Sequence, residues 1–305
     1  MGRIAKGLGW IAFAVLATLG IFLAEAHWEI RRIAPLLADR GALDAKLDAP
    51  GGPIRLHVIN TATQPGGDGG PSIGHPSFRI EWPDGRVFLI DVGMDPAGAE
   101  EFGRTLELLI DAEPIQPHGS LAEQLGADAQ NVAGVAFTHL HIDHTQGFAE
   151  LCRSVGRGID VFETTWQARR GNYTTASGRE AVDASGCARK RELADGPVYT
   201  VPGFPGLVAV AAGGHTPGST VYFVRVGDTT WALAGDISNF HDALIENRPK
   251  PKLYSLLVTP EATTRLEALR RWLAAIHALP GYEVVVSHDV DAIAASGPPA
   301  WSGRD

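Results

Sequence analysis

The amino-acid sequence predicts an α+β fold in which two mixed β-sheets pack face to face and helices lie outside them. Strand-like apolar segments followed by helical segments occur in both halves of the region from residue 54 to residue 295. Two sheets packed in this way bury their apolar faces against each other. The chain has 305 residues, of which 45% are hydrophobic and 20% charged, so it is long enough for one large domain with a substantial core.

The first half of this domain is predicted to contain short strands joined by turns. Residues 54–60, 78–82 and 87–91 have strand patterns, and the turn Pro83-Asp84-Gly85-Arg86 joins the last two into a hairpin. The glycine-rich stretch 64–74 is typical of an exposed loop. The remaining expectations are a helix over 100–112, a buried strand ending at Thr138, a strand over 159–162 and an irregular polar insert over 164–193.

The second half repeats the strand-to-helix order. Apolar strands are predicted over 197–201, 207–211, 220–226 and 229–234, with a last strand over 283–287. An amphipathic helix is expected over 260–279, because Pro260 suits its first turn and Pro280-Gly281 follows its end. The domain therefore spans 54–295, and residues 296–305 form a C-terminal tail.

Residues 1–26 are predicted to be a signal peptide or an N-terminal membrane anchor. The uncharged apolar run 8–23 follows Arg3 and Lys6, and its length lies between a signal-peptide core and a full membrane span. Ala24-Glu25-Ala26 resembles a cleavage pattern, so both removal and retention stay open. A buried core helix is the alternative, which the absence of a polar face disfavours.

The position of the charges indicates on which side of the membrane the domain lies. Positive charge ahead of the apolar run favours an N-inside orientation, so the rest of the chain would be secreted or membrane-anchored on the periplasmic or extracellular side. A helical linker over 27–53, ending at Pro50-Gly51-Gly52-Pro53, is expected to join the N-terminal segment to the domain.

The charge and cysteine content exclude some classes of partner. A formal net charge of -9 lacks the basic footprint of a protein that neutralises phosphates, so a nucleic-acid partner is excluded and a small-molecule substrate favoured. Cys152 and Cys187 are the two cysteines; they form one disulfide in an oxidising compartment or remain two small buried thiols. The sequence carries no signal for the oligomeric state.

A cluster of histidines follows the predicted strand that ends at Thr138. His139 and His141, two residues apart, can chelate one metal ion, while Asp143 and His144 can point toward a second ion beside it. Burying four such polar groups without a metal would leave several of them unpaired, at about 1 to 3 kcal/mol each. The cluster therefore predicts a metal site.

Three further segments place a potential ligand directly after an apolar strand. His215 lies in Gly213-Gly214-His215-Thr216-Pro217-Gly218-Ser219, Asp236 follows Leu233-Ala234-Gly235, and His288 follows Val284-Val285-Val286-Ser287. Strand ends converge along one edge of a sheet sandwich. We therefore expect these three side chains to complete two metal coordination shells.

The order of HxHxDH, then His, then Asp, then His resembles the metallo-β-lactamase superfamily over about residues 54–289. The resemblance implies the αββα metallo-β-lactamase fold and two Zn²⁺ ions, with iron, manganese or cobalt as alternatives. It implies that His139, His141 and His215 hold the first metal, that Asp143, His144 and His288 hold the second, and that Asp236 bridges them. Asp91 looks like the family's early aspartate, which supports the ligand loop, and its alternative role is a strand-to-turn cap.

The remaining histidines match no ligand position of the family. They are interpreted as structural or solvent-facing, with His241 lining the pocket as the one alternative: His27, His57, His75, His118, His241 and His277.

The reaction implied by the resemblance is hydrolysis by a metal-bridging hydroxide, with Asp143 as the catalytic residue that steers this nucleophile and takes its proton. The motif style is most similar to N-acyl homoserine lactonases, which predicts a lactone or a related carboxylic ester as substrate. The chain has Asn239 where those enzymes often carry a tyrosine, and Ser219 where they often have a further histidine. The bridging Asp236 argues against a β-lactamase.

Other functions stay open beside the lactonase reading. They are a thioesterase of glyoxalase II type, a phosphodiesterase, an iron persulfide dioxygenase-like enzyme and a membrane-tethered sensing module without turnover. Substrate recognition is expected from residues 64–74, from the insert with Trp166 and Tyr173, and from residues 240–254. In this last segment, the cations Arg248, Lys250 and Lys252 either bind an anionic group or belong to a solvated loop.

Overall fold

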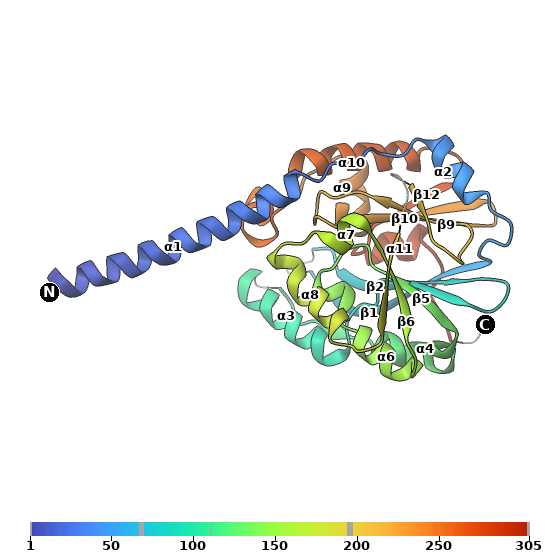
Figure 1. Cartoon of the computed structure of the whole chain (residues 1–305), viewed down its shortest axis with the longest axis horizontal. Helices are drawn as coiled ribbons and strands as arrows, with labels where there is room; N and C mark the ends of the chain where they lie inside the picture. The colour runs from blue at the N-terminus through green and yellow to red at the C-terminus, as the bar shows by residue number, and fades with distance from the viewer. Residues whose placement is uncertain (1, 67–69, 111, 194–197, 304–305) are drawn as a thin grey trace.

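Two β-sheets form the centre of the molecule in the computed structural model, which describes residues 2–66, 70–110, 112–193 and 198–303 (Figure 1). The larger sheet has the strand order β4-β1-β2-β3-β5-β6-β7 and the smaller one β12-β11-β10-β9-β8. The strands of the larger sheet are β1 (Arg55–Gln64), β2 (Ile73–Glu81), β3 (Val87–Ile90), β4 (Gln116–Pro117), β5 (Val132–Ala136), β6 (Ile159–Thr164) and β7 (Ala188–Leu193). Those of the smaller sheet are β8 (Val198–Thr200), β9 (Leu207–Ala211), β10 (Thr220–Val226), β11 (Thr229–Leu233) and β12 (Tyr282–Val285).

Both sheets are mixed, because each combines hairpins with parallel pairs. In the larger sheet β1, β2 and β3 pair antiparallel, and β3, β5, β6 and β7 pair parallel. In the smaller sheet β8 to β11 pair antiparallel, and β12 joins β11 in parallel. The α+β class and the two mixed sheets predicted from the sequence are confirmed.

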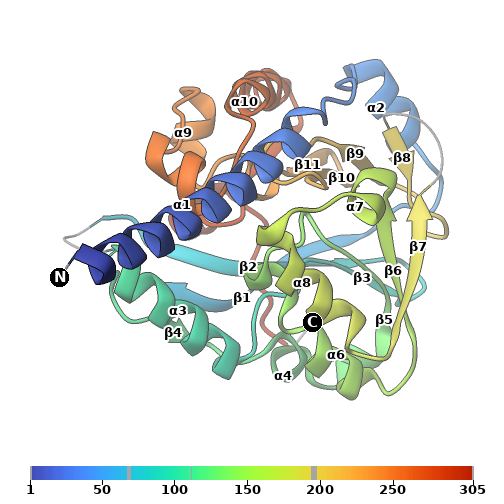
Figure 2. The same ribbon diagram turned by 60° about the vertical axis from the view of Figure 1, so that its left-hand side comes forward.

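Three apolar clusters hold the layers together. The inner faces of the two sheets meet in a cluster that includes Phe78, Phe88, Tyr222 and Leu233. A second cluster lies between the smaller sheet and α2 and α10, and a third between the larger sheet and α4, α6 and α8. The layer order is therefore helix, sheet, sheet, helix, which buries both faces of each sheet (Figure 2).

The helices cover these outer faces. They are α2 (Arg40–Leu47), α3 (Pro96–Ile110), α4 (Leu121–Leu125), η2 (Gly126–Asn131), α5 (Ile142–Thr145), α6 (Phe148–Val155), α7 (Thr165–Arg169), α8 (Tyr173–Asp183), η3 (Gly235–Ile237), α9 (His241–Ile245), η4 (Tyr254–Val258), α10 (Thr263–His277) and α11 (Val290–Ser296). In α10 the buried side chains Leu266, Leu269, Leu273 and Ile276 recur every three or four residues and form the stripe that faces the smaller sheet.

The N-terminal helix α1 (Gly2–Arg31) projects from one side of the domain (Figure 1). Its segment Lys6–Arg31 is long and apolar enough to cross a membrane, and its most apolar stretch is not buried against the domain. The last turns differ, because Ala26 and Ile30 are buried. The helix continues through residue 26, where the sequence predicted the boundary between the N-terminal segment and the linker.

Most of the predicted elements are present, with boundaries shifted by a few residues. The expected strand over 197–201 corresponds to β8, and residue 197 lies outside the described residues. The helix predicted over 260–279 begins only at Thr263, so Glu261 precedes it.

The prediction of an irregular insert over 164–193 was wrong. This segment forms α7, α8 and β7, because Thr164 and Asn172 cap the two helices and β7 pairs with β6. Helix α8 approaches the histidine loop closely: a Cβ atom on Gly178 would lie 2.2 Å from the carbonyl oxygen of Leu140. Glycine at this position lets α8 pack directly on the loop that carries His139 and His141.

Cys152 and Cys187 form a disulfide, which is the first of the two alternatives left by the sequence. The bond joins α6 to the residue that precedes β7, at the edge of the larger sheet.

Candidate metal centre

The histidine loop lies at the carboxyl end of β5. His139 and His141 are in the irregular segment after this strand, and Asp143 and His144 are in the first turn of α5. In the smaller sheet, His215 lies in the loop between β9 and β10, Asp236 in η3 after β11, and His288 after β12. The seven side chains singled out in the sequence lie together at one edge of the sandwich, within three groups whose donor atoms lie within 4.8 Å of one another.

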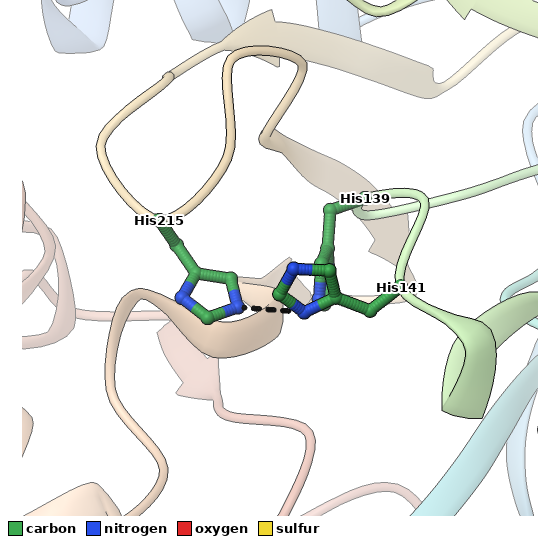
Figure 3. Close-up of side chains that lie close together, drawn as sticks. All are labelled: His139, His141 and His215. Atoms are coloured by element: carbon green, nitrogen blue, oxygen red, sulfur yellow. Dashed lines mark hydrogen bonds between the residues drawn. The ribbon is translucent and has the colours of Figure 1, made fainter. Parts of the chain in front are cut away.

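The first group contains His139, His141 and His215 (Figure 3). Nε2 of His215 lies 3.2 Å from Nδ1 of His141, and the ring centroid of His139 lies 4.5 Å from that of His141 and 4.7 Å from that of His215. Two imidazole nitrogens that face each other require a shared proton or a cation that both can ligate. This geometry fits a bound metal ion.

The second group is His75, Asp143 and His288, and the third is His139, His144 and Asp236. The carboxylate of Asp236 connects the third group to His288 of the second. Oδ2 of Asp236 lies 2.8 Å from Nε2 of His288 and 3.6 Å from Nε2 of His215, and its Oδ1 lies 3.4 Å from Nε2 of His144. Asp236 therefore lies between two histidine sets, of which one is His139, His141 and His215 and the other is His144 and His288. In this position one carboxylate can bind two ions.

Several of these buried polar atoms have no hydrogen-bond partner. Within the described part of the chain, no such partner is present for Nε2 of His139, Nε2 of His144 or Oδ1 of Asp236. A buried polar atom left without a partner costs about 1 to 3 kcal/mol, so three in one group is unfavourable unless a cation occupies their centre. Imidazole nitrogen and carboxylate oxygen are also the donors that zinc accepts, so the residues fit a metal centre.

Hydrogen bonds to the far side of the rings hold the histidines in position. Nδ1 of His144 lies 2.9 Å from Oδ2 of Asp91, which also accepts a hydrogen bond from Oγ1 of Thr138 at 2.7 Å. The other oxygen of Asp91 accepts from the backbone N–H of Thr138. Asp91 thus supports the ligand loop, and it does so from a left-handed backbone with φ of 59°.

Glu261 and Gly74 hold the rings on the smaller-sheet side. Nδ1 of His215 lies 2.7 Å from Oε1 of Glu261, and Nδ1 of His288 lies 2.7 Å from the carbonyl oxygen of Gly74. Each contact turns the Nε2 atom toward Asp236. Glu261 was not singled out in the sequence, because the helix expected to start at Pro260 would have made it an ordinary first-turn residue.

Lys250 is buried beside Glu261. Its Nζ lies 3.0 Å from Oε1 of Glu261 and donates a hydrogen bond to the carbonyl oxygen of Asp236 at 3.0 Å. Of the two roles that the sequence left open for this cation, the solvated loop is therefore wrong. Lys250 forms an ion pair with Glu261 and a hydrogen bond with Asp236, and these contacts connect the segment before η4 to the metal-ligand candidates.

Of the two roles that the sequence left open for His75, structural or solvent-facing, the solvent-facing one is wrong. It is buried at the start of β2, and its Nδ1 lies 3.3 Å from Oδ2 of Asp143, in one donor group with His288. Because β2 pairs antiparallel with β3, the start of β2 lies at the same edge as Asp91. The sequence pattern started this strand at residue 78 and left His75 in a loop, which concealed the signal.

The two carboxylates and two of the histidines stabilise each other's charged forms. Burial would raise the pKa of Asp143 and Asp236, but His144 beside the first and His288 beside the second hold both well below the ordinary value. Burial would lower the pKa of His144 and His288, and the same two carboxylates raise both. The carboxylates are therefore ionised, as ligation requires.

The histidines of the first group are held neutral. Burial lowers the pKa of His141 to about 3, and His215 adds to this effect. Burial likewise lowers the pKa of His139 and of His215, and for His215 the nearby Lys250 contributes. Neutral imidazole is the form that binds a metal ion, so this group is prepared for one.

A cavity of about 510 Å³ opens beside these donors. Asp143, Asp236 and His141 form part of its wall. The rest of its lining combines apolar and polar side chains: Ile73, His75, Phe102, Thr105, Leu106, Ile142, Tyr173, Thr174, Ser177, Asn239, Lys250, Pro251, Tyr254, Val258, Thr259 and His288.

The three segments expected to recognise substrate contribute unequally to this wall. Tyr173 lines the cavity, whereas Trp166 packs against the core between the sheets. His241 lines a different and smaller cavity beside β12. Ser219 is buried, and its Oγ accepts a hydrogen bond from the backbone N–H of Thr216 at 2.9 Å, which shapes the loop that carries His215.

Comparison with known proteins agrees with this fold. Residues 73–288 match the family model of the metallo-beta-lactamase superfamily, so the chain belongs to that superfamily. This membership indicates a metal-dependent hydrolase. No curated protein sequence matches the chain significantly.

Solved structures share the architecture at low sequence identity. An N-acyl homoserine lactone hydrolase, solved with N-hexanoyl-L-homoserine at its catalytic metal centre, superposes with a TM-score of 0.56 at 14% identity, over 80% of this chain and 96% of that one. A Bacillus thuringiensis enzyme with N-decanoyl-L-homoserine at its active site gives 0.55 and 14%, again over 80% and 96%. A probable metal-dependent hydrolase from Staphylococcus aureus gives 0.52 and 15%, over 78% and 90%.

Proposed function

We propose that this chain is a dinuclear metal-dependent hydrolase that opens a lactone or a related carboxylic ester. The observation that carries the proposal is the position of Asp236 between two histidine sets, at the wall of a cavity of about 510 Å³. A site that holds one iron, as in the dioxygenase alternative, needs no second set of donors. The complete ligand set also disfavours a sensing module that has lost turnover.

The proposed ligands follow the two histidine sets. His139, His141 and His215 would hold one ion, Asp143, His144 and His288 would hold the other, and Asp236 would be shared between them. Zinc is the metal we expect, because all seven donors are imidazole nitrogens or carboxylate oxygens. Two bound zinc ions would supply Lewis acidity, which lowers the pKa of water toward 7 and polarises a substrate carbonyl.

The protein's own residues would position the reactants. Asp143, which is ionised and lines the cavity, can accept the proton of the attacking water and pass it to the leaving oxygen. Asn239 and Tyr254 are also in the wall, where an amide and a phenol can contact polar atoms of the substrate. Tyr254 thereby offers a phenol although Asn239 stands at the position where the lactonases often have one.

The choice of a lactone or ester rests on the cavity wall and on the solved relatives. Ile73, Phe102, Leu106 and Val258 offer apolar surface beside the donors, which suits the acyl part of an ester. Two of the relatives with the same fold were solved with acyl-homoserine molecules at the site.

We propose further that residues 1–26 remain attached as an N-terminal membrane anchor, that 27–53 link it to a catalytic domain over 54–295, and that 296–305 are a tail. Retention is supported by the continuous helix α1 and by the burial of Ala26 and Ile30, since cleavage after residue 26 would cut a helix that packs on the domain. The disulfide favours the periplasmic or extracellular side.

The test uses the full chain purified in detergent micelles. Metal content per chain is measured, and lactones, aryl esters, thioesters and phosphodiesters are assayed side by side. We expect two metal equivalents and turnover of lactones or carboxylic esters, lost in His141→Ala and Asp236→Ala. His118→Ala, an exposed histidine outside the donor groups, is the matched control. Turnover confined to phosphodiesters or thioesters, or one metal per chain, would overturn the proposal.

A further inference from the structure

Large apolar side chains are exposed next to the catalytic cavity. Leu253, Leu256, Leu257 and Val258 are between 48% and 70% exposed in and just before η4, and Leu108 at the end of α3 is 84% exposed. Four such side chains within six residues form a patch that water solvates poorly. We refer to residues 253, 256, 257 and 258 as the η4 patch.

The η4 patch lies beside α1, the helix that is apolar enough to cross a membrane. Nε2 of His27, in the last turns of α1, lies 3.1 Å from the carbonyl oxygen of Leu256. On the other side of α1, the ring centroids of Phe22 and Tyr173 are 4.8 Å apart, and Glu29 pairs with Arg170 at 3.3 Å. In Figure 1, α1 leaves the domain on the side where α3, α8 and the orange segment ahead of α10 lie.

These contacts fix the position of the domain relative to α1, and therefore relative to a bilayer that α1 would cross. The apolar run of residues 8–23 would rise about 24 Å as a helix, against a hydrocarbon core of about 30 Å. Phe22 belongs to the last turn of this run and touches Tyr173 of the domain. If the run spans a bilayer, the domain would reach the depth at which the run ends, and the η4 patch beside α1 would lie at the boundary between headgroups and acyl chains.

The catalytic cavity opens toward the same surface. Val258 and Tyr254 of η4, Leu106 of α3 and Tyr173 of α8 all line it. Tyr173 also lines a second cavity of about 290 Å³, whose opposite wall is Phe22, Glu25, Ala26 and Glu29 of α1. Tyr173 thus lines both the cavity beside the metal-ligand candidates and a space bounded by α1.

We propose that the η4 patch and the end of α3 rest on the bilayer that holds α1, and that the catalytic cavity takes its substrate from this bilayer. The substrate class is an amphiphile whose lactone or carboxylic ester reaches the metal donors while its acyl chain stays against the apolar wall. The docking part rests on the contacts above, and the substrate part rests on the proposed hydrolase function.

The docking part is tested without any assay of turnover. Because the two native cysteines are joined, a single introduced cysteine is the only free thiol of the oxidised full chain. Leu257→Cys, and in a second sample Leu253→Cys, is labelled with an environment-sensitive dye and reconstituted into phosphatidylcholine vesicles. Ile54→Cys is the matched control: it is 48% exposed, and the segment between α2 and β1 lies away from the N-terminal end of α1 (Figure 1).

We expect lipid-borne nitroxide to quench the labels at 257 and 253 and aqueous iodide to quench the label at 54. Equal quenching by iodide at all three positions would overturn the docking surface.

The substrate part is tested by two substrates of the same ester chemistry. The ratio of the rate on a long-chain ester embedded in vesicles to the rate on a short soluble ester is measured for the full chain, for the combined variant L253S/L256S/L257S and for Ile54→Ser. We expect the combined variant to lower this ratio about tenfold and Ile54→Ser to leave it unchanged. An unchanged ratio in the combined variant would overturn bilayer delivery. If the unmodified chain hydrolyses neither ester, the hydrolase proposal fails together with the substrate part, while the label positions still decide the docking.

Discussion

Nδ1 of His75 lies 3.3 Å from Oδ2 of Asp143, and both donors belong to one group with His288. His75 is buried at the start of β2, and this contact, like that of the Gly74 carbonyl oxygen with His288, brings the start of β2 into the site. Burial lowers the pKa of His75, so its ring is neutral and presents one N–H and one bare nitrogen to its surroundings. A neutral ring in this place holds the Asp143 carboxylate toward the second set of donors.

Replacing His75 should therefore weaken the second metal. In His75→Ala we expect the affinity for one of two zinc equivalents to fall by about 10- to 100-fold, and His75→Asn to recover part of the loss because its amide N–H can stand in for Nδ1. Chelator competition followed by metal analysis measures both. His118→Ala serves as the control, and a His75→Ala protein that retains both ions as firmly as the unmodified chain would contradict this role.

The buried pair of Lys250 and Glu261 should show strong coupling in a double-mutant cycle. Breaking a buried pair by removing one partner costs about 3–5 kcal/mol, because the other charge stays buried. We expect Glu261→Gln and Lys250→Met each to lower the free energy of unfolding of the metal-free protein, and the double variant to lose less than the sum of the two losses. Denaturant titration of the four proteins gives the coupling, and simple additivity would rule out the pair as a unit.

Glu261→Gln should also affect metal binding, since Glu261 accepts the hydrogen bond from Nδ1 of His215. A glutamine oxygen can still accept this bond but lacks the charge that strengthens it. We expect the first metal to bind about tenfold more weakly. Isothermal titration with zinc measures this, with Glu246→Gln, an exposed carboxylate, as the control.

Reduction of the disulfide should destabilise the domain. Cys152 and Cys187 are separated by 35 residues in sequence. A disulfide that closes a loop of this size raises the free energy of unfolding by about 2–4 kcal/mol. We expect the double variant Cys152→Ser, Cys187→Ser to unfold at a correspondingly lower denaturant concentration. A reducing agent should shift the unmodified chain to the same midpoint and leave the variant unchanged, and an identical midpoint with and without reductant in the unmodified chain would refute the stabilising role.

Alkaline pH should weaken the attachment of α2 to the smaller sheet. The hydroxyl of Tyr282 donates a hydrogen bond to Oδ1 of Asp44 at 2.6 Å, and burial together with this carboxylate raises the pKa of Tyr282 to about 12. A group whose pKa is raised in the folded state stabilises the fold fully below its unfolded pKa of about 10, and this stabilisation is lost as the pH rises toward 12.

Denaturant unfolding of the unmodified chain should therefore show a decline in stability above about pH 10 that Tyr282→Phe lacks. Tyr199→Phe is the comparison, because Tyr199 lies in β8, at the opposite edge of the smaller sheet from Tyr282 in β12, and has no contact with Asp44 among the interactions of the described residues. A parallel alkaline decline in Tyr282→Phe would show that the tyrosine is not its source.

The sequence by itself determined the class of fold and predicted which ligand candidates would meet at one edge of it. The alternating and apolar strands are local patterns, as are Pro260 at an expected first helical turn and the order of His139, Asp236 and His288 after strands. Each pattern reports on its own few residues. Because parallel and hairpin-linked strands of a sandwich end at shared edges, these patterns also predicted that distant ligand candidates would meet there.

The tertiary structure alone decided which other groups join that edge. His75 lies in a segment with the local pattern of a loop, and Glu261 was expected in an ordinary first helical turn. Lys250 lies between prolines, as a solvated cation would. Their side chains are removed from solvent only because other elements cover them. Packing between segments far apart in the chain also sets the contact of Phe22 with Tyr173. Burial and desolvation depend on all neighbours in space, whereas a local sequence pattern records the neighbours in the chain.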